Sequence, residues 1–372
     1  MPPLRLAAVI GTRPEAIKLA PVILAARARP AQYEIEIVRT GQHGELVDAM
    51  LSEFDLEADV DLHVMQRDQD LAHVLAESVR GLSELFARTR PDWVIVQGDT
   101  TTTLAGALSA FYNHARVGHV EAGLRTGDRT SPFPEEANRS LTARLADLHF
   151  APTEGARRNL LREGIEPAAI VVTGNTVVDA LLGTCRRNAD TPARDERAAP
   201  GYVLVTAHRR ESHGEALSRI CDAVRELLER HPCTRVWIPM HPSPRVREVI
   251  VSRLGGHDRA VLTEPLGYAA FVRAVQGATL VLTDSGGVQE ECAALGKPVL
   301  VLREHTERPE CVDAGVARVV GTSSDAIVAA ASRLLDHPPS RDAMAHATAA
   351  FGVGDAAERI LAALSEEAGR RR

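Results

Sequence analysis

The sequence lacks the features of several large protein classes. Its five cysteines include no Cys-x-x-Cys pair, which argues against zinc binding or a dithiol switch and fits a reducing compartment. No apolar run approaches the roughly 20 residues that a membrane-spanning helix needs. Residues 1–5 lead directly into a strand-like segment, with no sign of a secretory leader. We therefore expect a cytoplasmic protein that has no membrane partner.

Charge and motifs exclude further classes. Lys and Arg number 43 against 50 Asp and Glu, so the net charge of -7 does not favour nucleic acid as a partner. No G-x-G-x-x-G fingerprint occurs, and a tightly bound NAD is therefore not expected. H-E-x-x-H and Walker A motifs are also absent. We predict neither a metal ion nor an organic cofactor.

Short apolar runs alternate with longer amphipathic segments, such as 70–88 and 214–230, along the whole chain. The runs are almost continuously hydrophobic, as expected of parallel strands that are covered by helices on both faces. With 372 residues, this order predicts two doubly wound, Rossmann-like α/β domains. The predicted strands are Leu4–Ile10, Glu34–Arg39, Trp93–Gln97, Val117–Val120, Ile170–Thr173, Tyr202–Ala207, Arg235–Pro239, Ala260–Thr263, Thr279–Thr283, Val299–Leu302 and Arg318–Val320.

We assign residues 1–172 to the first domain and 173–352 to the second. The segment Arg186–Pro200 is polar and without periodicity. It is either the joint between the domains or a loop just inside the second one.

An anion site is indicated in the second half. The run Leu280–Thr283 breaks at Asp284-Ser285-Gly286-Gly287 and resumes with helix-favouring residues. Backbone N–H groups of glycine at a helix N-terminus bind phosphate. Glu291, nearly two turns into that helix, is placed to accept hydrogen bonds from the hydroxyls of a ribose. A phosphate site and a ribose contact together suggest a nucleotide. The alternative is a glycine pair that only lets a strand turn into a helix.

Charged residues also follow the predicted strands of the first half. Arg13 and Lys18 come directly after the first strand, where open α/β sheets bind ligands, although Pro14 and Glu15 also fit an ordinary helix start. Asp99 follows a second strand and precedes four threonines, which suit a sugar or an N-cap.

Five more charged residues extend this set. Glu121 and Arg125 stand between glycines at another strand end. Glu135 and Glu136 open a helix that carries Arg139, and there they also complement the helix dipole. Acidic residues at several strand and helix ends of one domain suggest acid–base groups around a single substrate.

Cations cluster at strand ends of the second half. His208 and Arg209 follow one strand, and an imidazole beside guanidinium groups is a good phosphate contact. His241 lies within a proline-rich turn, for which a structural role is equally plausible. Arg308 follows a later strand and is a natural partner for a diphosphate.

Taken together, these segments resemble the non-hydrolysing UDP-N-acetylglucosamine 2-epimerases. The resemblance runs in order from Gly11 to about Gly321. Its motifs are GTRPEAIKLAPV, VQGDTTTTLA, VGHVEAGLRTGD, SPFPEEANR, VTGNTVVDAL, TAHRRES, LTDSGGVQEE and GKPVLVLREHTERPE.

The resemblance implies a GT-B-like fold in which two Rossmann-like domains face a cleft and a C-terminal helix, about 353–372, packs back on the first domain. It implies interconversion of UDP-GlcNAc and UDP-ManNAc without NAD, in a homodimer. Elimination of UDP to a 2-acetamidoglucal, followed by re-addition, is the implied course. The implied catalytic residues are Asp99, Glu121, Glu135 and His208, and those implied to bind substrate or UDP are Arg13, Lys18, Phe271, Ser285, Gly286, Gly287, Glu291 and Arg308.

Some members of the resembled family are activated by a second UDP-GlcNAc, which implies an effector site. This sequence departs from the pattern of those members at two positions. A basic residue is replaced by Gly44 after Gln42-His43, and Ser243 stands where Asn is usual after His241. We therefore hypothesise weakened or altered activation. The candidate effector residues are Gln42, His43, Arg67, Glu136, Arg209 and His241.

Three other functions stay open on sequence alone. They are a GT-B glycosyltransferase that uses a UDP-sugar, a hydrolysing 2-epimerase that releases ManNAc and UDP, and a non-catalytic nucleotide-sugar sensor. The carboxylates of the first domain favour epimerisation over the glycosyltransferase and the sensor, whereas a leakier site would suffice for the hydrolysing enzyme.

Overall fold

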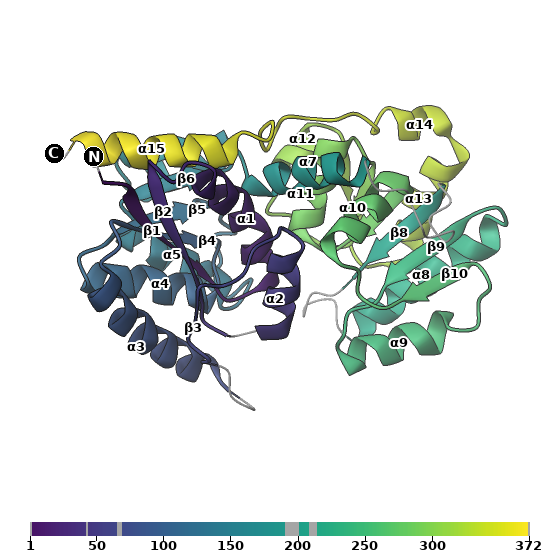
Figure 1. The fold of residues 1–372 in the computed structure, drawn as a ribbon. Coiled ribbons are helices and arrows are strands. Elements are labelled where there is room, and N and C mark those ends of the chain that lie inside the picture. Colours follow the sequence, from purple (N-terminus) through teal and green to yellow (C-terminus); the bar gives the residue numbers. More distant parts are fainter. Residues whose placement is uncertain (1, 42–43, 65–68, 190–200, 208–213, 371–372) are drawn as a thin grey trace. The chain divides into compact units, whose positions relative to one another are not determined.

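The computed structural model describes residues 2–41, 44–64, 69–189, 201–207 and 214–370 (Figure 1). The chain forms two compact units: Met1–Ala180 with Phe351–Arg372, and Leu181–Ala350. The division falls inside helix α7 (Thr176–Ala189), whereas the predicted boundary after residue 172 lies at the end of a strand. The first five residues of α7 thus belong to the first unit.

The first unit is built on a parallel sheet of seven strands in the order β3-β2-β1-β4-β5-β6-β7. Because the chain order reverses between β1 and β4, the turns after these strands lie at a switch point of the sheet, where such folds bind ligands. The strands are β1 (Leu4–Ile10), β2 (Tyr33–Arg39), β3 (Val60–Asp61), β4 (Trp93–Gln97), β5 (Arg116–Val120), β6 (Leu148–Ala151) and β7 (Ile170–Val172).

Helices cover both faces of this sheet. One apolar cluster joins α3 and α4 to alternate residues of the central strands, among them Val9, Val94 and Val96. On the opposite face α1 contacts both α2 and the C-terminal helix α15, and Figure 1 shows α15 running beside α1. The helices are α1 (Arg13–Arg27), α2 (Gly44–Ser52), α3 (Leu71–Thr89), α4 (Thr101–Tyr112), α5 (Glu135–Leu145), α6 (Glu154–Arg162), the 3-10 helix η1 (Pro167–Ala169) and α15 (Ala356–Arg370).

Helix α15 is tied to the first unit by polar and apolar contacts. The Tyr33 hydroxyl lies 2.7 Å from Ser365 Oγ, and Arg29 Nη2 donates to both carboxylate oxygens of Glu358 at 2.6 Å. Leu361 and Leu364 are fully buried. The last segment of the chain therefore completes the core of the first unit.

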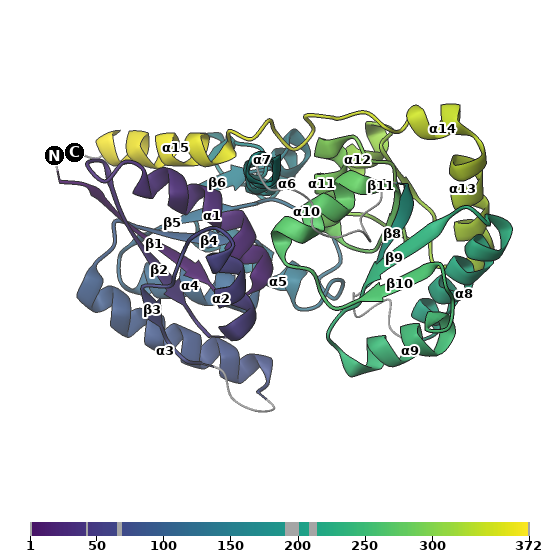
Figure 2. The same ribbon diagram turned by 45° about the vertical axis from the view of Figure 1, so that its right-hand side comes forward.

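The second unit holds a parallel sheet of six strands in the order β10-β9-β8-β11-β12-β13. Helix α8 shows how its helices are specified, because Leu217, Ile220, Val224 and Leu227 recur at helical spacing and are all buried. Figure 2 shows α8, α9 and α13 on one side of the sheet and α10, α11 and α12 on the other.

The elements of the second unit are β8 (Tyr202–Thr206), α8 (Glu215–Arg230), β9 (Arg235–Pro239), α9 (Pro244–Leu254), β10 (Ala260–Thr263), α10 (Tyr268–Gly277), β11 (Ala278–Thr283), α11 (Gly286–Leu295), β12 (Val299–Val301), α12 (Pro309–Asp313), β13 (Ala317–Val319), α13 (Ser324–Asp336) and α14 (Pro338–Asp342).

The predicted fold class, two Rossmann-like α/β domains, is confirmed. All predicted strands are present within one or two residues of their expected ends. Strands β3 and β6 were not predicted: β3 has two residues, and the apolar run of β6 is interrupted by His149. None of the described helices combines the length and the apolar character that crossing a bilayer requires.

Candidate functional site

Glu121, directly after β5, is the most constrained of the predicted residues in the first unit. The residue is 7 % exposed, and Lys18 Nζ donates to both carboxylate oxygens at 2.6 Å. Gln97 Nε2 donates to Oε2, and Asn175 Nδ2 donates to Oε1 at 2.9 Å. Three donors from α1, β4 and the segment after β7 therefore hold one buried carboxylate.

The backbone of Glu121 adopts a left-handed conformation, with φ of 63°. For a residue with a side chain, this conformation costs roughly 1–2 kcal/mol. Such outliers gather at functional sites, because the surrounding structure must compensate for them. The sheet places this carboxylate at the carboxyl end of β5, between the ends of β4 and β6.

Asp99 follows β4 through Gly98, whose φ of 74° suits glycine. Its carboxylate accepts from Arg139 Nη2 and its side chain is 27 % exposed, so it is both paired and accessible. Arg139 Nη1 lies 3.2 Å from Glu136, whose carboxylate also accepts from the backbone N–H groups of the turn at 126–127. Glu136, a candidate effector residue, thus orients the guanidinium that holds Asp99. Glu135, its neighbour in the first turn of α5, is half-buried.

Glu15 connects two of the predicted turns. Its Oε2 accepts from the N–H groups of Gly11 and Thr12 at 2.6 and 2.7 Å, and its Oε1 accepts from the Thr100 hydroxyl. Burial raises the pKa of the Glu15 carboxyl, against the hydrogen bond from Thr100 and the two backbone bonds, which lower it. The side chain therefore ties the turn before Arg13, which is exposed at the start of α1, to the turn after Asp99.

His119, within β5, contacts the turn between β4 and Asp99. Its Nε2 lies 2.7 Å from the carbonyl oxygen of Gly98, which can only accept, so the imidazole carries its proton on Nε2. Burial lowers the pKa of His119 to about 4. Burial also lowers the pKa of His149, which lies opposite His119 on the neighbouring strand β6, to about 3. Both rings are neutral near pH 7.

In the second unit, the turn between β11 and α11 has the predicted strand–glycine–helix form. Ser285 is the N-cap of α11, and its N–H donates to Thr283 Oγ1 at 3.0 Å. A Cβ on Gly286 would lie 3.1 Å from Arg308 Cζ, whereas one on Gly287 would meet nothing within 4 Å. Gly286 therefore lets the guanidinium pack on the backbone, and the face at Gly287 is open.

Arg308 is held in this position by two buried carboxylates. Its Nε donates to Glu290 Oε1 at 2.6 Å and its Nη1 donates to Glu307 Oε2 at 3.0 Å. The residue is 5 % exposed. A guanidinium fixed beside the N-terminus of a helix suits binding of a phosphate group.

The other predicted residues of this unit lie on neighbouring elements. Glu291, in α11, is buried, and burial raises the pKa of Tyr268 well above its ordinary value, with the charge of Glu291 adding to the effect. Phe271 is half-buried on α10. His241 Nδ1 accepts from the backbone N–H of Ser243 at 3.2 Å, so this contact does not need the side chain at position 243.

In the first unit, Lys18 thus pairs with Glu121, and Asp99 is joined to Glu136 through Arg139. In the second unit, Ser285, Gly286 and Gly287 open α11, where Arg308 packs on Gly286 and Glu291 lies farther along the helix. Five predicted positions lie outside the described residues: Gln42, His43, Arg67, His208 and Arg209.

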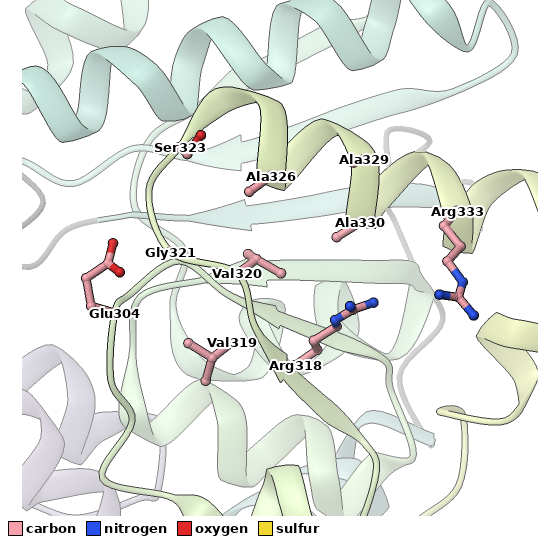
Figure 3. A pocket seen from close by; sticks show the side chains of 10 residues that line it. All are labelled: Glu304, Arg318, Val319, Val320, Gly321, Ser323, Ala326, Ala329, Ala330 and Arg333. Atoms are coloured by element: carbon pink, nitrogen blue, oxygen red, sulfur yellow. The ribbon is translucent and has the colours of Figure 1, made fainter.

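A surface depression of about 690 Å³ lies elsewhere in the second unit, between β13 and α13. Figure 3 shows Glu304 at one end of it and Arg318 and Arg333 at the other, with alanines of α13 between them. Its lining includes none of the predicted site residues. We assign it no function.

With this geometry established, comparison with known proteins decides the family. A sequence model of UDP-N-acetylglucosamine 2-epimerase matches residues 25–365. The chain belongs to this family. A probable UDP-N-acetylglucosamine 2-epimerase of Ralstonia nicotianae is 48 % identical over 365 residues, which cover 96 % of this chain and 97 % of that protein.

Solved structures of 2-epimerases agree with this assignment. The UDP-GlcNAc 2-epimerase of Neisseria meningitidis, bound to UDP-GlcNAc, superposes with a TM-score of 0.94 at 40 % identity, covering 98 % of this chain and all of that one. The MnaA–UDP structure from S. aureus superposes with a TM-score of 0.92 at 41 % identity, covering 98 % and 97 %.

Sequence reasoning missed several residues that orient the predicted ones. Gln97, His119 and Asn175 donate to Glu121 or to the Gly98 carbonyl, and Glu290 and Glu307 orient Arg308. The available signal was position: Gln97 ends β4, and Asn175 follows β7 after one glycine and one threonine. Polar residues at the carboxyl ends of parallel strands are therefore candidates for site residues, because such sheets bind ligands at that edge.

Proposed function

We propose that the protein interconverts UDP-GlcNAc and UDP-ManNAc without releasing free sugar and without NAD. The observation that carries this proposal is Glu121, a buried carboxylate in a strained backbone conformation that three donors orient. The N. meningitidis relative solved with UDP-GlcNAc and the S. aureus relative solved with UDP support the choice of ligand.

The reaction has two halves. The C2 hydrogen of the sugar is not adjacent to a carbonyl and is hardly acidic. Breaking the C1–O bond sends its electron pair to the UDP phosphate and leaves C1 electron-poor, so that a carboxylate can take the C2 proton. A 2-acetamidoglucal with a C1–C2 double bond results. Return of a proton to the other face of C2, and of the UDP oxygen to C1, gives the epimer with no water consumed.

Residues of the second unit stabilise the leaving group in this scheme. The N–H groups of Gly286 and Gly287 at the start of α11, together with Arg308, bind the diphosphate, where negative charge grows as the C1–O bond breaks. Ser285 is the N-cap at the same turn, and Glu291 accepts the ribose hydroxyls. Phe271 offers an apolar surface for the base.

Residues of the first unit act on the sugar. Asp99, Glu121 and Glu135 are the proposed acid–base carboxylates, and His208 is added to them from the family pattern. Lys18 orients Glu121, and Arg13, exposed at the start of α1, is a further proposed contact to UDP. Asp99 differs from Glu121 in being partly exposed, which suits a group that touches substrate directly.

One experiment tests this function. The protein is incubated with UDP-GlcNAc in D2O and followed by NMR. We expect UDP-ManNAc to appear with deuterium at C2, and the remaining UDP-GlcNAc to gain deuterium as well. Free ManNAc with UDP would show a hydrolysing enzyme, and reaction only with an added acceptor would show a glycosyltransferase. Binding with neither outcome would show a sensor.

We also propose a homodimer in which activation by a second UDP-GlcNAc is weakened. The support is Gly44 in place of a basic residue, together with Ser243 beside His241. Initial rates against UDP-GlcNAc concentration should be hyperbolic, and the sugar should not accelerate turnover of UDP-ManNAc. Strong sigmoidicity would contradict the proposal. Sedimentation equilibrium tests the dimer.

A further inference from the structure

Asn175 makes two contacts that link distant parts of the first unit. The residue is 1 % exposed and follows β7. Its side-chain Nδ2 donates to Glu121 Oε1 at 2.9 Å, and its backbone N–H donates to the carbonyl of Phe351 at 2.7 Å. Phe351 is the first residue of the segment that returns to this unit after the second one.

The chain therefore crosses itself at Asn175. A Cβ on Gly174 would lie 3.0 Å from Gly352 Cα, and one on Gly352 would lie 3.1 Å from Gly174 Cα. Both glycines also have positive φ, 84° and 102°. The segment that leads out of the first unit and the segment that leads back are thus in direct backbone contact, which glycine alone permits.

The orientation of the Asn175 amide follows from its partners. Its Oδ1 accepts from Val177 N–H at 3.4 Å, which directs Nδ2 at the carboxylate, where only a donor fits. Two further donors to Glu121 belong to regular elements of the first unit, Lys18 to α1 and Gln97 to β4. Asn175 instead belongs to the crossing.

We propose that Asn175 is a positioning residue through which this crossing sets the orientation of Glu121. The inference rests on the proposed catalytic role of Glu121. A change in the path of either segment at Gly174 and Gly352 moves the backbone of Asn175, and with it the amide that holds the carboxylate. Proton transfer at C2 is then efficient only when the crossing has its closed, hydrogen-bonded form.

The first test is Asn175→Ala in the D2O assay with UDP-GlcNAc. We expect kcat to fall about 10- to 100-fold, the usual effect of losing a hydrogen bond to a charged group, while KM changes less than about threefold. Asp179→Ala is the matched control, because Asp179 Oδ1 accepts from Ala357 N–H at 2.9 Å and joins the same two segments without a hydrogen bond to Glu121. It should lower Tm and leave kcat within about twofold of the wild type.

The second test separates positioning from general damage. Gly352→Ala disturbs the crossing and should lower kcat in the wild-type background, but not further when combined with Asn175→Ala. Should Gly352→Ala fail to fold, Phe351→Leu, which alters the buried side chain beside the accepting carbonyl, takes its place. Additive losses of kcat in the double variant, or an Asn175→Ala enzyme with wild-type kcat, would overturn the role of Asn175 but leave the proposed function intact. A wild-type protein without C2 exchange would remove the proposed function and, with it, this role.

Discussion

Lys18 donates to both carboxylate oxygens of Glu121 at 2.6 Å across 103 residues of sequence. The two side chains are 11 % and 4 % exposed, so the pair is almost completely removed from water. Such a pair carries a desolvation cost, because each charge has lost its hydration and is compensated only by its partner. The pairing fixes the orientation of the carboxylate of the candidate site and ties α1 to the end of β5.

Removal of the ammonium group should therefore be costly. For Lys18→Met we expect the free energy of unfolding to fall by about 3–5 kcal/mol, as for other buried pairs that lose one partner. Urea denaturation measures this change. Lys18→Met/Glu121→Gln should recover part of the loss, since the unpaired charge is then gone. Arg80→Ala, which breaks an exposed pair with Glu77, is the control and should cost less than about 1 kcal/mol. Equal losses of unfolding free energy for Lys18→Met and Arg80→Ala would contradict the prediction.

The two glycines that open α11 should respond differently to alanine. Gly286→Ala places a methyl group 3.1 Å from Arg308 Cζ and should destabilise the fold and weaken binding of UDP, which calorimetry measures. Gly287→Ala meets nothing within 4 Å and should leave Tm unchanged or raise it, because alanine favours the helix by about 1 kcal/mol. A larger loss of Tm for Gly287→Ala would show that the packing of Arg308 on Gly286 is unimportant.

Stability should depend on pH through His119. Its pKa is about 4 in the folded protein, against an ordinary value of about 6.5, so between these values the unfolded chain binds the proton more readily. The free energy of unfolding should consequently fall as the pH drops from about 6.5 to 4, by about 3 kcal/mol from this residue. His149, with a pKa of about 3, acts in the same direction.

Comparison with His119→Gln isolates this contribution, because glutamine offers a donor for the Gly98 carbonyl but does not titrate. Urea denaturation at a series of pH values should give a shallower loss for the variant. Contributions from other groups, including Glu15, largely cancel in the difference. Parallel curves for the two proteins would show that His119 does not titrate as expected.

The last helix should be required for the stability of the first unit. Leu361 is fully buried in α15, and Leu361→Ala should lower the free energy of unfolding by about 2–5 kcal/mol. Leu141, 54 % exposed on α5, is the matched control, for which we expect a change below about 0.5 kcal/mol. Thermal denaturation of the two variants side by side decides the matter. Similar losses would mean that α15 adds little to the core.

The sequence predicted much of the framework because the relevant signals are local. Continuous apolar runs marked the strands, and the glycine pair after Thr283 marked the turn into α11. Family motifs then brought Lys18, Asp99 and Glu121 into one site, and the structure places Lys18 on Glu121. Strand β6 was not predicted because His149 interrupts its apolar run, although that ring is buried as a neutral group.

The supporting residues could not be predicted, since their partners are distant in sequence. Nothing near Asn175 indicates Glu121, 54 residues earlier, and nothing near Glu136 shows that it orients the guanidinium paired with Asp99. Glu15 has the local pattern of an ordinary helix start, yet it also joins the turn at Thr100. Hydrogen bonds between loops depend on how the sheet brings its strand ends together, which periodicity does not encode.

Because α15 completes the first unit, the two units are finished in the reverse of their order of appearance during synthesis. The ribosome delivers all of residues 181–350 before it makes the helix that fills the core of the first unit. Domains usually fold from the N-terminus as they emerge. Here the N-terminal unit must wait, with the apolar surface of α1 uncovered, until α15 has been made. A released chain truncated after residue 350 should therefore hold a folded second unit and an incomplete first one.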